Sequence, residues 1–221
     1  MDLQPKLLDV RIPAEPRGVV LVLHGGASRR ETMMVSPTQL SVLRMIPIAR
    51  RIARAGRGEL AVLRLLNSAR GWDTSHTPVD DVVWALAQLD ERFGRRVPTC
   101  LVGHSLGGRA ALLAAGRPGV RSAVALAPWV YPSDAPRGLT DQRILVVHGS
   151  QDRIAKPERA AAVARRIGAS FVSVTGGRHA MLARHGAFSA LAADWAAVTL
   201  LDAKPTGVLA RVAAGERQLE V

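Results

Sequence analysis

The chain of 221 residues contains one cysteine, one tyrosine and three lysines, and aromatic residues make up 4% of it. A single cysteine excludes both an intramolecular disulfide and a site built from several thiolates. Cys100 lies within an apolar segment, so we expect it to pack in the core. A reducing, cytoplasmic setting is the simplest interpretation of this cysteine usage.

Long apolar runs are also absent. No stretch of about 18 uncharged apolar residues occurs, and the apolar segment 187–201 is interrupted by Asp194. The first residues show no basic region followed by an apolar stretch, which a signal peptide requires. We therefore expect neither a transmembrane segment nor a signal peptide.

The charge is strongly one-sided, with a formal net charge of +12. Nearly all of the positive residues are arginines, and they are spread along the chain instead of forming a stripe interleaved with aromatic residues. The pattern therefore does not favour nucleic acid as a partner. Attraction of anionic substrates or of a membrane surface is the better interpretation of this charge.

Short aliphatic segments alternate with helical patterns from end to end, and most of them are continuously apolar, as in strands buried on both faces of a parallel sheet. The expected strands are 7–12, 19–24, 60–66, 99–104, 122–127, 144–148 and 171–174. This alternation predicts an α/β fold with a doubly wound, mostly parallel sheet. We expect one domain over residues 1–205, followed by a tail, 206–221, that is a short helix or mobile.

A pentapeptide, Gly103-His104-Ser105-Leu106-Gly107, follows one of these strands and leads into a helix-forming segment. A serine on a sharp strand-to-helix turn presents its hydroxyl clear of the sheet, above a helix N-terminus. The flanking glycines suit such a turn, because it brings their backbone close to neighbouring backbone. Ser105 is therefore the candidate nucleophile.

An activated serine needs a base and an acid that orients the base. In a parallel sheet, such groups converge where they leave the carboxyl ends of strands. Asp152 follows the strand 144–148 and His179 follows the strand 171–174, so we select these two. Asp134 stays open as an alternative acid and His185 as an alternative base. His24, His104 and His148, at strand ends, are expected to be supporting residues.

Four landmarks together carry a resemblance to a known family: His24-Gly25-Gly26, the pentapeptide around Ser105, the stretch 148–152 and Gly177-Arg178-His179. Over residues 6–203 the chain resembles compact α/β-hydrolases of the dienelactone hydrolase and carboxylesterase type. The order Ser, Asp, His is the one expected of that fold. The resemblance implies an α/β-hydrolase fold without a cap domain.

The resemblance also implies roles for the residues. Ser105 would attack an acyl carbon, His179 would take and return its proton, and Asp152 would orient the imidazole. The oxyanion would be held by the N–H of Leu106 and by a second N–H from Gly26, or otherwise from Ala27. No cofactor is implied, and the sequence lacks both a His-Glu-x-x-His zinc motif and a phosphate-binding loop.

The sequence allows more than one interpretation of the residues around the pocket. Met33 and Met34 follow the oxyanion loop and rim the acyl site in one interpretation, whereas in the other they begin a helix that runs through Leu40 and Ile48. Trp72 and Trp129 follow strands and are candidates to reach the crevice. The segment 128–143 is too short for a lid domain.

The leading hypothesis is a serine hydrolase that acts on a small-molecule carboxylic ester or thioester. Two alternatives stay open: an acyltransferase that uses the same three residues, and a non-catalytic binding protein of the same fold. The sequence leaves the natural substrate, its acyl length and the oligomeric state open.

Overall fold

A computed structural model describes residues 4–26, 35–69, 71–72, 77–136, 138–139 and 141–221. One sheet of eight strands runs through the molecule in the order β1-β3-β2-β4-β5-β6-β7-β8. Only β1 is antiparallel to its neighbour; the pairings among the other strands are parallel. The predicted α/β fold with a mostly parallel sheet is thereby confirmed.

The seven predicted strands lie within two residues of the predicted bounds, because most of them are short aliphatic runs that the sheet buries. Their bounds are β1 Lys6–Arg11, β2 Gly18–Leu23, β3 Leu60–Leu66, β4 Thr99–His104, β5 Val120–Leu126, β6 Arg143–Gly149, β7 Ser170–Val174 and β8 Gln218–Glu220. The central strands β2 and β4 are buried throughout.

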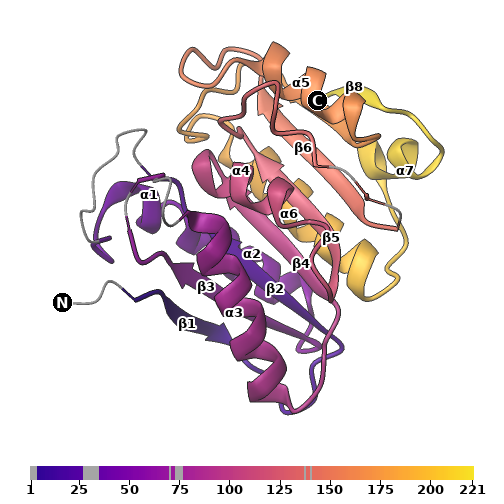
Figure 1. The fold of residues 1–221 in the computed structure, drawn as a ribbon. Coiled ribbons are helices and arrows are strands. Elements are labelled where there is room, and N and C mark those ends of the chain that lie inside the picture. The colour runs from indigo at the N-terminus through magenta and orange to yellow at the C-terminus, as the bar shows by residue number, and fades with distance from the viewer. Residues whose placement is uncertain (1–3, 27–34, 70, 73–76, 137, 140) are drawn as a thin grey trace.

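Helices cover both faces of the sheet (Figure 1). On one face pack α3 (Pro78–Phe93), α4 (Leu106–Leu113) and α5 (Pro157–Arg166). On the other face pack α2 (Met45–Ala55), α6 (His185–Leu200) and α7 (Gly207–Ala213). Strand alternation divides the core into two layers in this way, since Leu21 and Leu101 face the first set of helices and Val20 and Val102 face the second.

Residues at the two ends of α3 explain where this helix begins and ends. Thr77 accepts a hydrogen bond from the N–H of Val79 at 3.2 Å, while Asp80 accepts one from the N–H of Thr77 at 2.7 Å. This reciprocal pair satisfies donors that the first helical turn leaves without partners. Gly94 ends the helix in the left-handed region, with φ 62°.

The predicted helix through Leu40 and Ile48 is two helices in the structure, α1 (Leu40–Leu43) and α2, which meet at Arg44. Pro47 explains the break. In an unbroken helix its ring would clash with the carbonyl of Leu43 and remove a hydrogen bond, whereas the first turn of a new helix tolerates proline.

The C-terminal segment forms α7 and then a further strand, β8, which pairs in parallel with β7. The helix buries Leu209 and Val212, so this part of the tail is the short helix of the two states expected from the sequence. The strand was not predicted, since three residues, Gln218–Glu220, give too short a pattern to recognise. Among the described residues, no helix is long and apolar enough to cross a membrane.

Candidate active site

Ser105 lies at the carboxyl end of β4, at the turn into α4. Its backbone has φ 55° and ψ −118°, a region that residues other than glycine rarely occupy. The turn is held by two bonds: the N–H of Ser105 donates to Leu126 at 3.0 Å, and its carbonyl accepts from Trp129 at 3.1 Å. A Cβ on Gly103 would overlap the carbonyl of Gly107, and a Cβ on Gly107 would overlap the carbonyls of Leu23 and His24, which explains why both positions are glycine.

The structure brings together the three residues that the chain order selected. The Oγ of Ser105 lies 3.0 Å from Nε2 of His179, and Nδ1 of His179 lies 2.8 Å from Oδ2 of Asp152. Because a carboxylate only accepts, Nδ1 carries the proton and Nε2 is left to accept from the hydroxyl of Ser105. The imidazole therefore has the tautomer that a general base for Ser105 requires.

Asp152 is almost completely buried, at 6% exposure. Its other oxygen, Oδ1, accepts from the N–H groups of Ile154 at 2.8 Å and Ala155 at 3.0 Å. Burial acts to raise the pKa of Asp152, but the hydrogen bond and charge of His179 and these two N–H groups outweigh it and leave the pKa below its ordinary value. The carboxyl group is therefore ionised at neutral pH.

The two alternatives to these residues lie elsewhere. Asp134 forms a bidentate ion pair with Arg109, at 2.7 and 2.8 Å, and also accepts from the N–H of Tyr131 at 2.7 Å. This pairing fixes the loop after β5 against α4. His185 is the first residue of α6, and no hydrogen bond joins its buried Nε2 to any described residue.

The strand-end histidines bond to backbone, as expected of supporting residues. In His24, Nε2 accepts from the N–H of Asn67 at 3.1 Å and Nδ1 donates to the carbonyl of Gly25 at 2.6 Å. His104 donates from Nε2 to the carbonyl of His179 at 2.8 Å, so it anchors the backbone of the candidate base. Burial, followed by the charge of His179, lowers the pKa of His104 to about 3. His104 therefore stays neutral over the ordinary pH range.

His148 lies behind the carboxylate, fully buried, with Nδ1 3.9 Å from Asp152 and 3.3 Å from the carbonyl of Gly149. Burial lowers its pKa as well, so it is neutral beside the ionised Asp152. Among the described residues, no cluster of histidine, cysteine, aspartate and glutamate could hold a metal ion.

A pocket of about 360 Å³ opens over Ser105 and His179. Its walls include Gly25, Gly26, Arg44, Leu106, Trp129 and Ile154. Leu106 is the first residue of α4, and the first N–H groups of a helix have no partner within it. Gly26, the expected second donor, lines the same pocket, whereas Ala27 lies outside the described residues.

Of the four residues proposed to shape the pocket, Trp129 lines it. Trp72 does not: its ring lies under the guanidinium of Arg109, with the ring centroid 4.0 Å from the Cζ atom, and the same arginine pairs with Asp134. Met33 and Met34 lie outside the described residues. Sequence reasoning missed Arg44, a half-buried cation in the pocket wall. The sequence predicted one unbroken helix through this segment, with Arg44 in its interior. Burial lowers the pKa of its guanidinium.

Comparison with known proteins agrees with this fold. The model of the alpha/beta hydrolase family matches residues 19–143, more than half of the chain. The chain therefore belongs to the alpha/beta hydrolase family. No curated protein sequence matches it significantly.

Solved structures of the same fold include an alpha-beta serine hydrolase homologue from Coxiella burnetii, with a TM-score of 0.64 and 18% identity over 86% of this chain and 90% of that one. A serine hydrolase without a lid from Xanthomonas campestris has a TM-score of 0.63 and 18% identity, covering 91% and 97% of the two chains. Est1E from Butyrivibrio proteoclasticus has a TM-score of 0.62 and 15% identity, covering 89% and 94%. These identities establish a shared fold.

Proposed function

We propose that this protein is a serine hydrolase that cleaves a carboxylic ester or thioester through an acyl-enzyme on Ser105. The observation that carries the proposal is the unbroken relay from Ser105 through His179 to the buried Asp152. Ser105 and His179 line a pocket that is large enough for a small substrate. A protein that only binds a ligand has no need of such a relay.

In the proposed reaction, Oγ of Ser105 attacks the carbonyl carbon of the substrate while Nε2 of His179 takes the hydroxyl proton. The imidazolium then gives that proton to the leaving oxygen or sulfur as the acyl–leaving-group bond breaks. Water, activated by the same Nε2, releases the acid from Ser105. Throughout, Asp152 stays ionised and stabilises the imidazolium, in keeping with its lowered pKa.

The negative oxygen that forms in both steps needs donors that are already in place. The N–H of Leu106 at the start of α4 and the N–H of Gly26 are our candidates, since both residues line the pocket beside Ser105. The N-terminus of α4 adds the positive end of its dipole. One such donor is worth on the order of 3 kcal/mol in the transition state.

Solved structures of the same fold include an esterase domain from Rhodothermus marinus and a serine hydrolase homologue, and this agrees with the proposed reaction. Between β5 and β6, the described residues form no helix or strand that could cover the pocket. We therefore expect substrates of modest size. An acyl acceptor other than water would use the same three residues and would show as transfer in the presence of alcohols or amines.

A fluorophosphonate probe tests the nucleophile directly. The folded protein should be labelled at Ser105, and Ser105→Ala should abolish labelling. Ser41→Ala is the matched control, because Ser41 lines the same pocket without contact to His179. A folded wild-type protein that resists labelling contradicts the proposal. p-Nitrophenyl esters and acyl thioesters of graded length then define the substrate class.

A further inference from the structure

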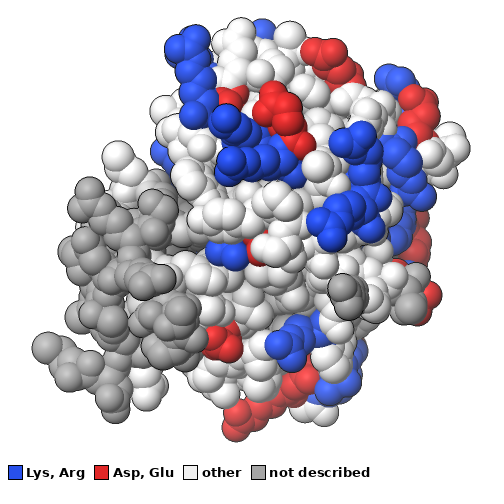
Figure 2. All heavy atoms as spheres, turned by 45° about the horizontal axis from the view of Figure 1, so that its top comes forward, with Lys and Arg blue, Asp and Glu red and all other residues white. Residues whose placement is uncertain are grey.

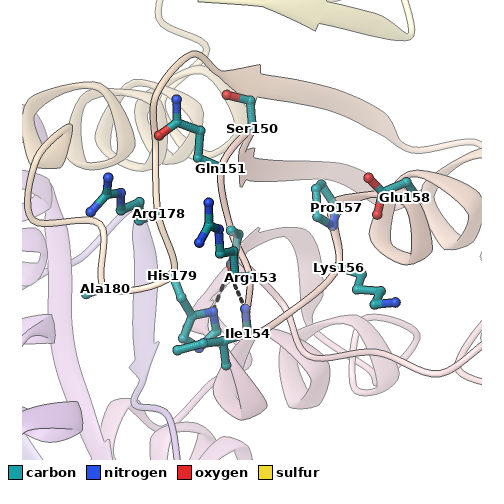
Figure 3. A pocket seen from close by; sticks show the side chains of 11 residues that line it. Ser150, Gln151, Arg153, Ile154, Lys156, Pro157, Glu158, Arg178, His179 and Ala180 are labelled. Atoms are coloured by element: carbon teal, nitrogen blue, oxygen red, sulfur yellow. Dashed lines mark hydrogen bonds and ion pairs between the residues drawn. The ribbon is translucent and has the colours of Figure 1, made fainter.

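A second and larger hollow adjoins the nucleophile pocket. Its volume is about 1120 Å³, and it lies between the loop after β6 and the loop after β7 (Figure 3). The two hollows share His179 and Ile154 in their walls. A molecule bound at Ser105 can therefore extend past His179 into this second hollow.

The second hollow is basic. Arg153, Lys156 and Arg178 line it, and no ion pair joins any of them to an acidic group among the described residues. Two acidic residues also line it, but Asp152 is directed at His179. Glu158 lies in the first turn of α5, where it complements the helix dipole. In Figure 3 it lies on the other side of the hollow from Arg178.

Several positive residues that line one hollow without acidic partners create a positive potential there, which favours an anionic ligand. Guanidinium groups are well suited to phosphate, because their N–H groups bind two of its oxygens at once. Lys and Arg side chains are prominent over the upper part of the face seen in Figure 2, with Asp and Glu side chains among them. The hollow therefore fits a phosphate-bearing group better than a neutral one.

The chemistry of the relay indicates which half of the substrate enters the hollow. His179 must protonate the leaving atom, so the leaving group has to lie against this imidazole. The second hollow adjoins His179, so it is the space that we assign to the leaving group. We propose that the substrate has an anionic, phosphate-bearing leaving group, which lies across His179 and Ile154 and is held by Arg153 and Arg178.

This inference rests on the proposed function and adds the substrate class. The proton that Nε2 takes from Ser105 passes to the leaving oxygen or sulfur. The bond from the acyl carbon to that atom breaks, and the bond from the acyl carbon to Oγ of Ser105 remains. The phosphate keeps its charge and takes no part in the bond changes. Its role is to bind and to orient.

A matched pair of thioesters tests the proposal: S-acetylpantetheine and S-acetyl-4′-phosphopantetheine. The two share the acyl group and the thiol and differ in one phosphate. At low salt, kcat/KM should be about tenfold higher for the phosphorylated compound, as two exposed ion pairs would give. The difference should lie mainly in KM and should shrink with added salt.

Variants assign the effect to the hollow. The ratio of the two kcat/KM values should fall several-fold in Arg153→Gln. It should approach one in the double variant Arg153→Gln with Arg178→Gln. Arg153→Lys, which keeps the charge, should retain part of the wild-type ratio. Arg159→Gln and Arg165→Gln are matched controls, since both arginines are exposed on α5 outside the hollow. They should keep the wild-type ratio.

Three results would overturn the proposal: equal kcat/KM for the two thioesters in the wild type, a ratio that the double variant leaves intact, or a preference for an acidic acyl group only. The last arm compares mono-4-nitrophenyl glutarate with 4-nitrophenyl valerate and uses Arg44→Gln, because Arg44 lines the nucleophile pocket. A preference for the glutarate ester, without a preference for the phosphorylated thioester, would show that the anionic group belongs to the acyl part of the substrate.

Failure of the proposed function is recognised separately. Absence of both turnover and fluorophosphonate labelling contradicts the hydrolase itself. Calorimetric titration with free 4′-phosphopantetheine and pantetheine then tests the hollow alone. Preferential binding of the phosphorylated thiol, lost in the double variant, supports the anion site, and equal binding of the two thiols overturns it.

Discussion

Gly149 and Gly177 meet backbone to backbone, where the loop that carries Asp152 passes the loop that carries His179. The N–H of Gln151 donates to the carbonyl of Gly177 at 2.9 Å. A Cβ on Gly149 would overlap that carbonyl, and it would lie 2.9 Å from the nitrogen of Arg178. The hydrogen bond between acid and base therefore depends on the absence of a side chain at position 149.

Gly149→Ala should push the two loops apart. We expect the free energy of unfolding to fall by about 1–3 kcal/mol, as in other overpacked sites. Turnover should fall about 100-fold or more, because a displacement near 1 Å in a relay has that cost. Urea denaturation and ester hydrolysis measure the two effects. Gly186→Ala is the control: a Cβ there meets no atom within 4 Å, so near-normal stability and turnover are expected.

Asp152→Asn should leave the fold nearly intact and lower kcat by about 10⁴-fold, the size of effect seen where an oriented imidazole loses its carboxylate. An amide cannot fix the tautomer in which Nε2 faces Ser105. Asp134→Asn is the matched comparison, because Asp134 pairs with Arg109 instead of a histidine. It should affect stability more than turnover, and the opposite ranking would place the acid after β5.

Much of the fold could be predicted because its signals are local. Most of the strands are aliphatic runs, and Thr77, Pro78 and Gly94 mark the ends of α3. The positions of Asp152 and His179 followed from one rule, that side chains converge at the carboxyl ends of parallel strands. The structure places His179 beside Ser105 and Asp152 beside His179.

Features that depend on tertiary contacts could not be predicted. The approach of Gly149 to Gly177 requires the register of β6 against β7. The pairing of Asp134 with Arg109 joins residues 25 positions apart and removes a rival acid that sequence alone kept open. Arg44 looks like an interior helical residue until Pro47 is known to lie in the first turn of a new helix. The basic hollow is lined by arginines from two loops, one after β6 and one after β7, and neither loop by itself shows a cluster of positive residues in the sequence.

Stability should fall in mild acid because buried histidines are neutral in the folded state. The pKa of His104 is about 3, against about 6.5 in an unfolded chain. Below pH 6.5 the unfolded state binds a proton that the folded state does not bind. The stability conferred by neutral His104 is therefore complete above pH 6.5 and is lost progressively as the pH falls toward 3. The pKa values of His24 and His148 shift in the same direction.

For His104 alone, the loss at pH 5 should be about 2 kcal/mol. Urea denaturation of the wild type and of His104→Gln at pH 7 and pH 5 measures it. Glutamine does not titrate and still offers a donor to the carbonyl of His179, so the variant should lose less stability between the two pH values. Identical losses in the two proteins would show that His104 does not set the pH dependence.

The acyl preference should level off at medium chain length. The nucleophile pocket holds about 360 Å³, and its apolar wall is limited, with Leu106, Trp129 and Ile154 as the large apolar members among the described residues. Each added methylene contributes at most about 0.8 kcal/mol, and only while apolar wall remains to bury it. A series of p-nitrophenyl esters from acetate to palmitate should therefore rise in kcat/KM and then plateau or fall.

Since no described element between β5 and β6 covers the pocket, short esters should reach Ser105 without a slow opening step, and rates should not jump at the micelle threshold. Rates that climb steadily to palmitate, or that rise abruptly with micelles, would indicate a deeper or covered pocket.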